Sequence, residues 1–257
     1  MIRTNQNGET EIALINIFAS INGEGYAAGK PTVFIRTMGC NLRCSFCDTK
    51  ECWNKTNFNK VYPDREDYMW LTAKQIFNKV EEMEKDYFHK SICLTGGEPL
   101  MLDNTEFMMN ELLPLFVNAK YDIGIETDGA IDVSAYKQKF GNAKVINENG
   151  DREGITMICD YKLPSSKMNH LMINNNLYCC SEMDLVKMVI SDDPEDWEIL
   201  TNLVEYWDVK PTIYLSPCFG NVTMNKIPEF IMAHANKRIR AQLQIHKFFW
   251  DVNTKDV

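Results

Sequence analysis

Strand-like and helix-like segments alternate along most of this 257-residue chain. Short runs rich in β-branched and aromatic residues predict strands, and apolar residues recurring every three or four positions predict helices between them. The predicted strands cover residues 11–18, 32–38, 91–95, 121–126, 143–146, 155–159, 185–190, 212–215 and 239–245. The predicted helices cover 72–88, 104–119, 133–140, a segment starting at 193–194, and 227–236. This order predicts an α/β fold, a full or partial (β/α) barrel of about six units, with a parallel sheet inside and helices outside.

Local signals support several of the predicted helix boundaries. Thr72 and Gln75 have the spacing of a capping box at the start of the helix 72–88. Pro194 suits the first turn of its helix, whereas Pro114 predicts a kink inside the helix 104–119. The chain contains no internal repeat and no Pro- or Gly-rich linker. We therefore expect residues 1–257 to form a single domain.

Polar and glycine-rich segments follow five of the predicted strands. They are residues 95–99, 126–129, 160–162, 216–218 and 246–247. In a barrel of this kind the loops after the strands converge at one face, and the chemistry of the protein is found there. The sequence therefore predicts that these five segments meet at one site.

The balance of charge and apolar residues excludes some functions. Lys and Arg number 27 against 36 Asp and Glu, a net charge of −9, and such a surface repels polyphosphate. We expect no nucleic-acid partner. No apolar run approaches the roughly 20 residues of a membrane helix, and the polar residues 1–11 do not look like a secretory signal. We therefore expect a soluble, cytoplasmic protein with no membrane partner.

Three clustered cysteines dominate the chemistry that the sequence suggests. Cys40, Cys44 and Cys47 form a C-x3-C-x2-C run directly after the strand 32–38. Thiolates suit iron–sulfur clusters or zinc. Three ligands would leave one iron of a 4Fe-4S cluster with an open position that a small chelating molecule can occupy. The alternative is a zinc site that Cys52 closes as the fourth ligand, in a non-catalytic module.

The cysteine run, with Phe46 before its last cysteine, resembles the signature of the radical S-adenosylmethionine (SAM) superfamily. Gly96-Gly97-Glu98-Pro99, 49 residues beyond Cys47, is similar to the second signature of that superfamily. The resemblance implies a 4Fe-4S cluster held by Cys40, Cys44 and Cys47. It also implies that SAM chelates the open iron and is cleaved to a 5′-deoxyadenosyl radical that abstracts hydrogen.

A narrower resemblance covers most of the chain. The segments 20–25, 34–36, 39–41, 47–49 and 244–247 are similar to those of the 7-carboxy-7-deazaguanine synthase family, radical SAM lyases of queuosine biosynthesis. The resemblance implies the substrate 6-carboxy-5,6,7,8-tetrahydropterin and the product 7-carboxy-7-deazaguanine, formed with loss of ammonia. It further implies a Mg2+ ion, a homodimer, and an electron donor such as flavodoxin or ferredoxin.

The same resemblance implies a role for individual residues. The implied substrate contacts are Ile21, Asn22, Gly23, Glu24, Arg36, Thr95 and His246. The implied SAM contacts are Phe46, Cys47, Asp48, Gly97, Glu98, Asp160, Tyr161, Lys162, Ser216, Pro217, Cys218 and Phe219. Thr49 is the implied Mg2+ ligand, and a hydroxyl oxygen suits that hard cation.

Some places depart from the family pattern. Asn22 and Ser216 stand where the family usually has Gln, and residues 248–257 extend beyond the usual end after the His-Lys segment. Segments 52–70 and 147–184 are longer or less familiar and are expected to be insertions. Another radical SAM enzyme, such as an activase of a glycyl-radical enzyme, is the alternative within the superfamily.

Overall fold

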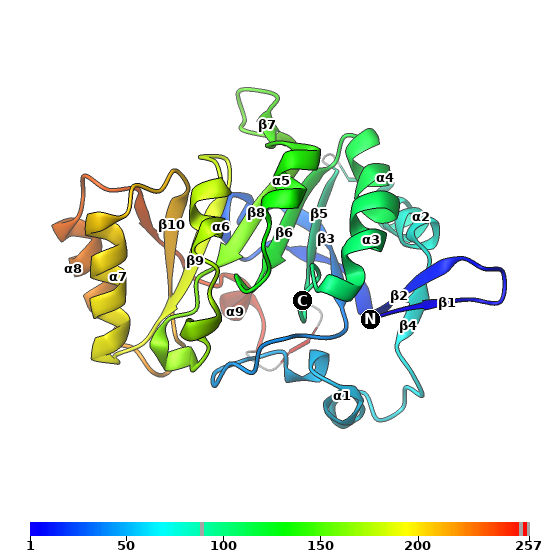
Figure 1. The fold of residues 1–257 in the computed structure, drawn as a ribbon, viewed down its shortest axis with the longest axis horizontal. Coiled ribbons are helices and arrows are strands. Elements are labelled where there is room, and N and C mark those ends of the chain that lie inside the picture. The colour runs from blue at the N-terminus through cyan, green and yellow to red at the C-terminus, as the bar shows by residue number, and fades with distance from the viewer. Residues whose placement is uncertain (88–89, 252–253, 256–257) are drawn as a thin grey trace.

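Seven parallel strands form the centre of the computed structural model, which describes residues 1–87, 90–251 and 254–255 (Figure 1). In spatial order they are β3 (Pro31–Thr37), β5 (Ser91–Gly96), β6 (Asp122–Thr127), β8 (Arg152–Asp160), β9 (Leu185–Ile190), β10 (Thr212–Pro217) and β11 (Ile239–Ala241). Each strand in this order pairs in parallel with the next. The spatial order follows the chain order, as it does in a barrel built from successive strand–helix units.

Antiparallel strands extend the sheet beside β3. They are β2 (Thr10–Ile21) on β3, then β1 (Ile2–Thr4) and β4 (Met69–Leu71) on β2, while β7 (Lys144–Val145) forms a hairpin with β8. Strands β1 and β11 lie at opposite ends of this order. The sheet is thus an open, partial barrel, one of the two forms that the sequence predicts, and six crossovers carry its helical units.

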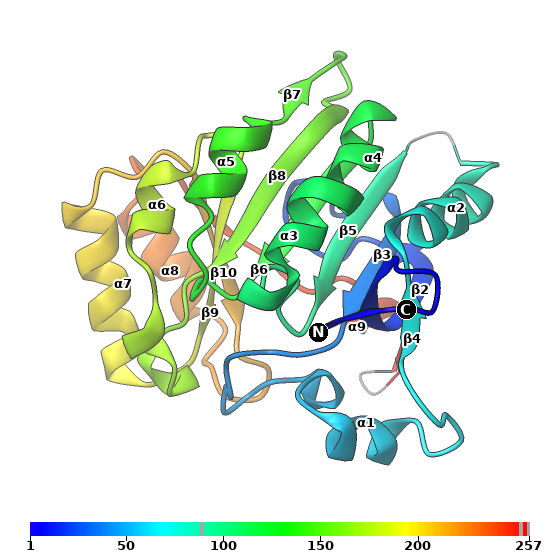
Figure 2. The same ribbon diagram turned by 45° about the vertical axis from the view of Figure 1, so that its right-hand side comes forward.

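Helices cover the outer face of the sheet (Figures 1 and 2). They are α2 (Ala73–Glu84), α3 (Thr105–Phe107), α4 (Leu113–Asn118), α5 (Ser134–Phe140), α6 (Asn175–Cys179), α7 (Pro194–Tyr206) and α8 (Lys226–Ala233). Two further helices, α1 (Lys55–Val61) and α9 (His246–Phe249), lie at the lower edge of the sheet in Figure 1, where the chain after β3 also passes. In the described part of the chain no helix is long and apolar enough to cross a membrane.

Alternation along each strand separates an apolar outer face from a mixed inner face. On β9, Val186 and Met188 pack under α7 in one hydrophobic cluster, whereas Lys187 and Val189 point inward. The inner face is closed at the start of the strands by a layer of four side chains: Tyr26, Ile158, Leu185 and Tyr214. Polar residues lie beyond this layer, toward the strand ends, so the fold directs them into one space.

The start of α2 confirms the predicted capping box. The Thr72 hydroxyl accepts a hydrogen bond from the backbone N–H of Gln75, whose side chain accepts one from the backbone N–H of Thr72. The helix ends at Glu84, four residues before the predicted end, and residue 88 itself lies outside the described residues.

Two predicted elements differ in the structure. The helix predicted over 104–119 is divided into α3, a π-helical segment (Met108–Leu112) and α4, because Pro114 has no N–H for the regular helical bond. The strand predicted over 239–245 stops at Ala241, and His246 begins α9. Its pairing with β10 ends where Ala241 lies beside Leu215, and the side chain of the next residue, Gln242, donates instead to Ser216 and Glu24. The prediction was therefore wrong for residues 242–245.

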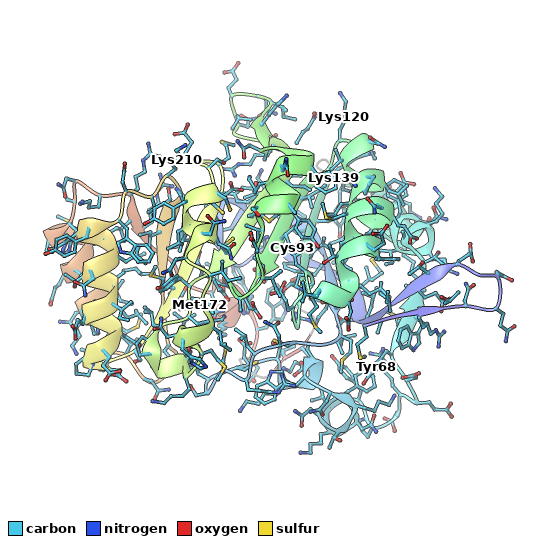
Figure 3. All side chains as sticks on the ribbon, in the orientation of Figure 1. Tyr68, Cys93, Lys120, Lys139, Met172 and Lys210 are labelled. Carbon is cyan, nitrogen blue, oxygen red and sulfur yellow. The ribbon has the colours of Figure 1, made fainter. Side chains whose placement is uncertain are left out.

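The less familiar segments contain short elements that the patterns did not predict. Segment 52–70 holds α1 and the start of β4, and segment 147–184 holds α6 together with 3-10 turns at Pro164–Ser166 and Asn169–Leu171. Figure 3 shows Tyr68 and Met172 in the lower half of the molecule and Lys120, which precedes β6, at the upper edge. Both segments therefore contribute to the end of the sheet at which the parallel strands finish.

Candidate active site

A cavity of about 530 Å³ opens at the carboxyl ends of the parallel strands. All five polar segments predicted to converge contribute to its wall, together with the cysteine loop and the loop after β2. Most of the residues singled out in the sequence line it. They are Ile21, Asn22, Gly23, Glu24, Arg36, Cys40, Cys44, Phe46, Cys47, Asp48, Thr49, Thr95, Gly97, Asp160, Lys162, Ser216, Pro217, Cys218, Phe219 and His246.

The three clustered cysteines are free thiols that face this cavity. Burial raises the pKa of Cys40 to about 12 and also raises the pKa of Cys44. Without a bound cation both groups are therefore neutral at ordinary pH, and their thiolate forms need a metal or cluster to stabilise them. Within residues 1–87, 90–251 and 254–255, no three acidic, His or Cys side chains converge closely enough for a single metal ion. Thiols spread around a cavity fit a cluster, in which each binds a different iron atom.

Cys52 does not join the other three. It is fully buried in an apolar cluster with Ala13, Ile15, Met38 and Phe58, and it is absent from the cavity wall. Its backbone carbonyl accepts the N–H of Gly39 at 2.8 Å, so this segment supports the cysteine loop from behind. The arrangement does not support the alternative of a zinc site closed by Cys52.

The glycine segment packs directly against the start of the cysteine loop. The backbone N–H of Gly97 donates to Thr37 O at 3.1 Å, and that of Glu98 donates to Gly39 O at 2.7 Å. A side chain on residue 97 would overlap the Gly39 carbonyl, and Gly39 itself has a positive φ of 99°. Only glycine therefore lets the two segments approach this closely beside the cavity.

Two of the expected SAM residues do not line the cavity. Glu98 is fully buried behind its wall, where its carboxylate accepts hydrogen bonds from the backbone of Leu100 and Asp128 and from the Thr127 hydroxyl. Its oxygens hold the glycine segment to the end of β6 rather than pointing toward a ligand. The Tyr161 ring turns outward, its edge against Trp207. Only the backbone of Tyr161 remains near the cavity, between the lining residues on either side of it.

Arg36 presents a cation to the cavity from the end of β3. Within the described part of the chain its guanidinium forms no ion pair, and it lies over the Phe18 ring, 5.5 Å from the ring centre. Thr95, its register partner on β5, donates to Glu126 over 2.6 Å. Arg36 is therefore available to a ligand anion, whereas the Thr95 hydroxyl already has a partner.

A buried network of charges crosses the cavity floor. The Lys187 ammonium contacts Glu24 at 2.9 Å and Asp160 at 3.5 Å, and the second oxygen of Asp160 binds Lys162. Burial alone would raise the pKa of Asp160, but Lys162 and Lys187 outweigh it and the pKa is lowered. The carboxylate of Asp160 is thus held ionised between two cations.

Lys187 and Gln242 are functional candidates that the sequence reasoning missed. Gln242 donates to Ser216 at 2.8 Å and to Glu24 at 3.2 Å, and it accepts the backbone N–H of Gly25 at 2.7 Å. A lysine in the middle of an apolar strand was a signal for Lys187, because such a charge needs a buried partner. The sequence held no comparable signal for Gln242. Residue 242 was predicted to lie in a strand, and the direction of its side chain depends on where that strand ends.

His246 reaches the cavity from the first turn of α9. Its ring packs so close to Gly23 that a side chain on residue 23 would overlap Nδ1, and burial lowers the pKa of His246.

The C-terminal extension also returns to this region. Lys255 lies 2.9 Å from Glu51 and donates to the Asp48 carbonyl at 2.9 Å, so the described residues beyond α9 border the cavity, while 252–253 and 256–257 lie outside the described residues.

Comparisons with known proteins show the relatives of this chain. The model of the radical SAM superfamily matches residues 34–144, which include the cysteine loop and the glycine segment. The 7-carboxy-7-deazaguanine synthase of Clostridium acetobutylicum is 33% identical over 95% of this chain and 98% of its own. The enzyme of the same name from Leptospira interrogans is 28% identical over 91% of this chain and 93% of its own.

The fold has a counterpart among solved structures. The crystal structure of QueE from Escherichia coli superposes with a TM-score of 0.62 at 20% identity, covering 90% of this chain and 94% of that one. Radical SAM enzymes use a 4Fe-4S cluster and SAM, and the three thiols of the cavity, with the glycine segment beside them, fit these groups. From the near full-length similarity to the Clostridium enzyme and the match across the cysteine loop, this chain belongs to the 7-carboxy-7-deazaguanine synthase family of radical SAM enzymes.

Proposed function

We propose that the protein converts 6-carboxy-5,6,7,8-tetrahydropterin into 7-carboxy-7-deazaguanine, the product named in its relatives. The pterin loses one nitrogen and three hydrogen atoms, which leave together as ammonia, so the overall reaction consumes no oxidant. One observation carries the proposal: the cavity of the three cysteine thiols also contains Arg36, a cation without an acidic partner among the described residues. A site that holds a carboxylated substrate beside the cluster needs such a group.

The cysteine loop and the glycine segment form the cofactor half of the proposed site. Cys40, Cys44 and Cys47 would hold the cluster, and the cradle at Gly97 would admit the amino group of SAM. When bound there, the cluster and SAM supply the one-electron chemistry that removes hydrogen from C6 of the pterin. The remaining SAM contacts would come from Phe46, Cys47, Asp48, Asp160, Lys162 and residues 216–219.

The loop after β2 forms the substrate half. Arg36 would bind the substrate carboxylate through its planar fork. Glu24 accepts from Lys187 and Gln242 on Oε2 and from Gln244 on Oε1, which leaves acceptor capacity on Oε1 for a ring N–H of the pterin. The side-chain oxygen of Asn22 accepts a hydrogen bond from the backbone N–H of Glu24 at 3.0 Å. Its NH2 group is therefore available to donate to a substrate carbonyl.

Mg2+ and the partners of the enzyme complete the proposal. Thr49 lines the cavity two residues after Cys47 and would offer its hydroxyl to Mg2+ beside oxygens of the substrate. An electron donor of the flavodoxin or ferredoxin class would reduce the enzyme. A homodimer, carried over from the family resemblance, and a cytoplasmic location, expected from the sequence, are part of the same proposal.

Anaerobic incubation with SAM, a chemical reductant, Mg2+ and the carboxytetrahydropterin tests the function. The expected result is 7-carboxy-7-deazaguanine by mass spectrometry and one ammonia per product. Release of 5′-deoxyadenosine without a deazapurine would contradict the proposed substrate and leave the assignment to radical SAM enzymes intact.

A further inference from the structure

Lys187 is the least expected residue of the cavity, because it is a charged side chain in the middle of an apolar strand. Its side chain is only 14% exposed. The pairing of β8 with β9 places it beside Asp160, and strand alternation turns it inward while its neighbours Val186 and Met188 join the outer core. The backbone therefore fixes this ammonium at one point of the cavity floor.

Carboxylates from three other segments surround that point. Glu24 comes from the loop after β2, Asp160 from the end of β8, and Glu126 from β6. Burial by itself would lower the pKa of Lys187, but these three acids outweigh burial and raise it well above its ordinary value. Lys187 is thus a permanent cation on which several segments depend.

The contacts on its two sides lead to different halves of the site. On one side Asp160 binds Lys162, both on the wall that we assign to SAM, and the charge of Lys162 acts on Cys44. On the other side Glu24, in the loop that we assign to the substrate, accepts hydrogen bonds from Gln242 and Gln244. A continuous series of short contacts therefore joins the two halves, and Lys187 is its central member.

We infer that Lys187 is a positioning residue that couples the SAM half of the cavity to the loop 22–25. This inference rests on the proposed function for the assignment of the two halves. A ligand that orders Asp160 and Lys162 fixes the Lys187 ammonium, which in turn fixes the Glu24 carboxylate and its loop. Thermodynamic linkage requires the reverse effect as well, so a ligand at the loop strengthens the binding of SAM.

Hydrogen exchange at the backbone amides of Glu24 and Gly25 tests this coupling without the pterin. In the holoprotein, addition of SAM should slow exchange of these amides about fivefold or more, the lower end of ordinary coupling between sites. In Lys187→Met the slowing should fall to within about twofold, since the loop then lacks its link to Asp160. The variant Lys187→Gln, which keeps a polar group, should behave in the same way if the methionine variant does not fold.

Lys137 offers a matched control, because it is another buried lysine paired with an aspartate. It binds Asp184 away from the cavity, with a side chain only 7% exposed. Lys137→Met should lower thermal stability and leave the SAM-dependent protection of the loop unchanged.

Three results would overturn the inference: no protection by SAM in the wild type, equal protection in Lys187→Met, or equal loss in Lys137→Met. Failure of the pterin to react, with the protection pattern as expected, would contradict the proposed substrate alone.

Discussion

The Ser45 hydroxyl, between the second and third cysteines, donates to the backbone carbonyl of Ser165 at 2.7 Å. The backbone N–H of Ser45 also donates to Ser166 at 3.1 Å. The turn that carries these carbonyls is fixed in its place by Asp196 of α7, which is fully buried. Asp196 accepts from the backbone N–H of Ser165 at 2.9 Å and from its hydroxyl at 2.6 Å. The cysteine loop is thus anchored to a helix more than 100 residues away in the sequence.

Replacing Asp196 by Ala should weaken both the fold and the cysteine loop. The change leaves two donors of Ser165 and two of Ser191 without their acceptor, so the free energy of unfolding should fall by about 3 kcal/mol. Iron should also be released faster when the holoprotein meets air. Asp193→Ala is the control, since it removes only the N-cap of the same helix at about 1 kcal/mol. Equal iron release from both variants would contradict this account.

Gly97→Ala should abolish SAM binding. The added methyl group would overlap the Gly39 carbonyl, so the glycine segment must move away from the cysteine loop. Gly124→Ala on β6 is a suitable comparison, because its nearest neighbour is the flexible end of Ile158 at 3.4 Å. Equilibrium binding of SAM to both holoproteins checks the prediction, and wild-type affinity in Gly97→Ala would refute it.

Arg36→Met should raise the KM for the pterin about 100-fold while SAM affinity stays within about threefold. A lost charge-assisted hydrogen bond is worth about 2–3 kcal/mol, which corresponds to that factor. Steady-state kinetics and SAM binding measure the two effects separately. Arg238→Met, which removes an exposed guanidinium, should change neither quantity. An unchanged KM in Arg36→Met would remove this residue from the substrate site.

Glu84 should make stability depend on pH. Burial raises its pKa from an ordinary 4.5 to about 7, so the folded protein favours the neutral form. The neutral Glu84 side chain therefore contributes its full stabilisation of the folded state below pH 4.5, and this contribution is lost as pH rises through about 7. Glu84→Gln stays neutral and should therefore lose about 1–2 kcal/mol less stability than the wild type between pH 5 and pH 8.

Urea unfolding at pH 5 and pH 8 measures this difference. Glu81→Gln, an exposed change on the same helix, should follow the wild type. Parallel loss of stability in wild type and Glu84→Gln would show that Glu84 does not titrate in this range.

The sequence predicted the parallel strands and the convergence of their ends because both follow from local patterns. Each short apolar run predicts a strand, and only a few topologies are compatible with this order of strands and helices. Capping signals at Thr72 and Pro194 were equally local and were confirmed. Elements without such patterns, including α1 and α6, could not be found in this way, because packing rather than periodicity determines them.

The contacts of Lys187 and Gln242 in the cavity could not be predicted, because they depend on the register between strands, which the sequence does not contain. Pairing of β8 with β9 sets Lys187 beside Asp160, and the early end of β11 turns Gln242 toward Glu24. Glu98, in contrast, was expected at the site from the sequence but lies behind the cavity wall. Its place in the glycine segment suggested a ligand contact, but the carboxylate is used by the chain's own N–H and O–H groups.

The open iron position left by three cysteine ligands is the central claim, and electron paramagnetic resonance of the reduced Cys52→Ala holoprotein tests it most directly. The account predicts about four irons per chain and a 4Fe-4S signal that shifts when SAM is added. A colourless protein with stoichiometric zinc, or a cluster signal that SAM leaves unchanged, would contradict it.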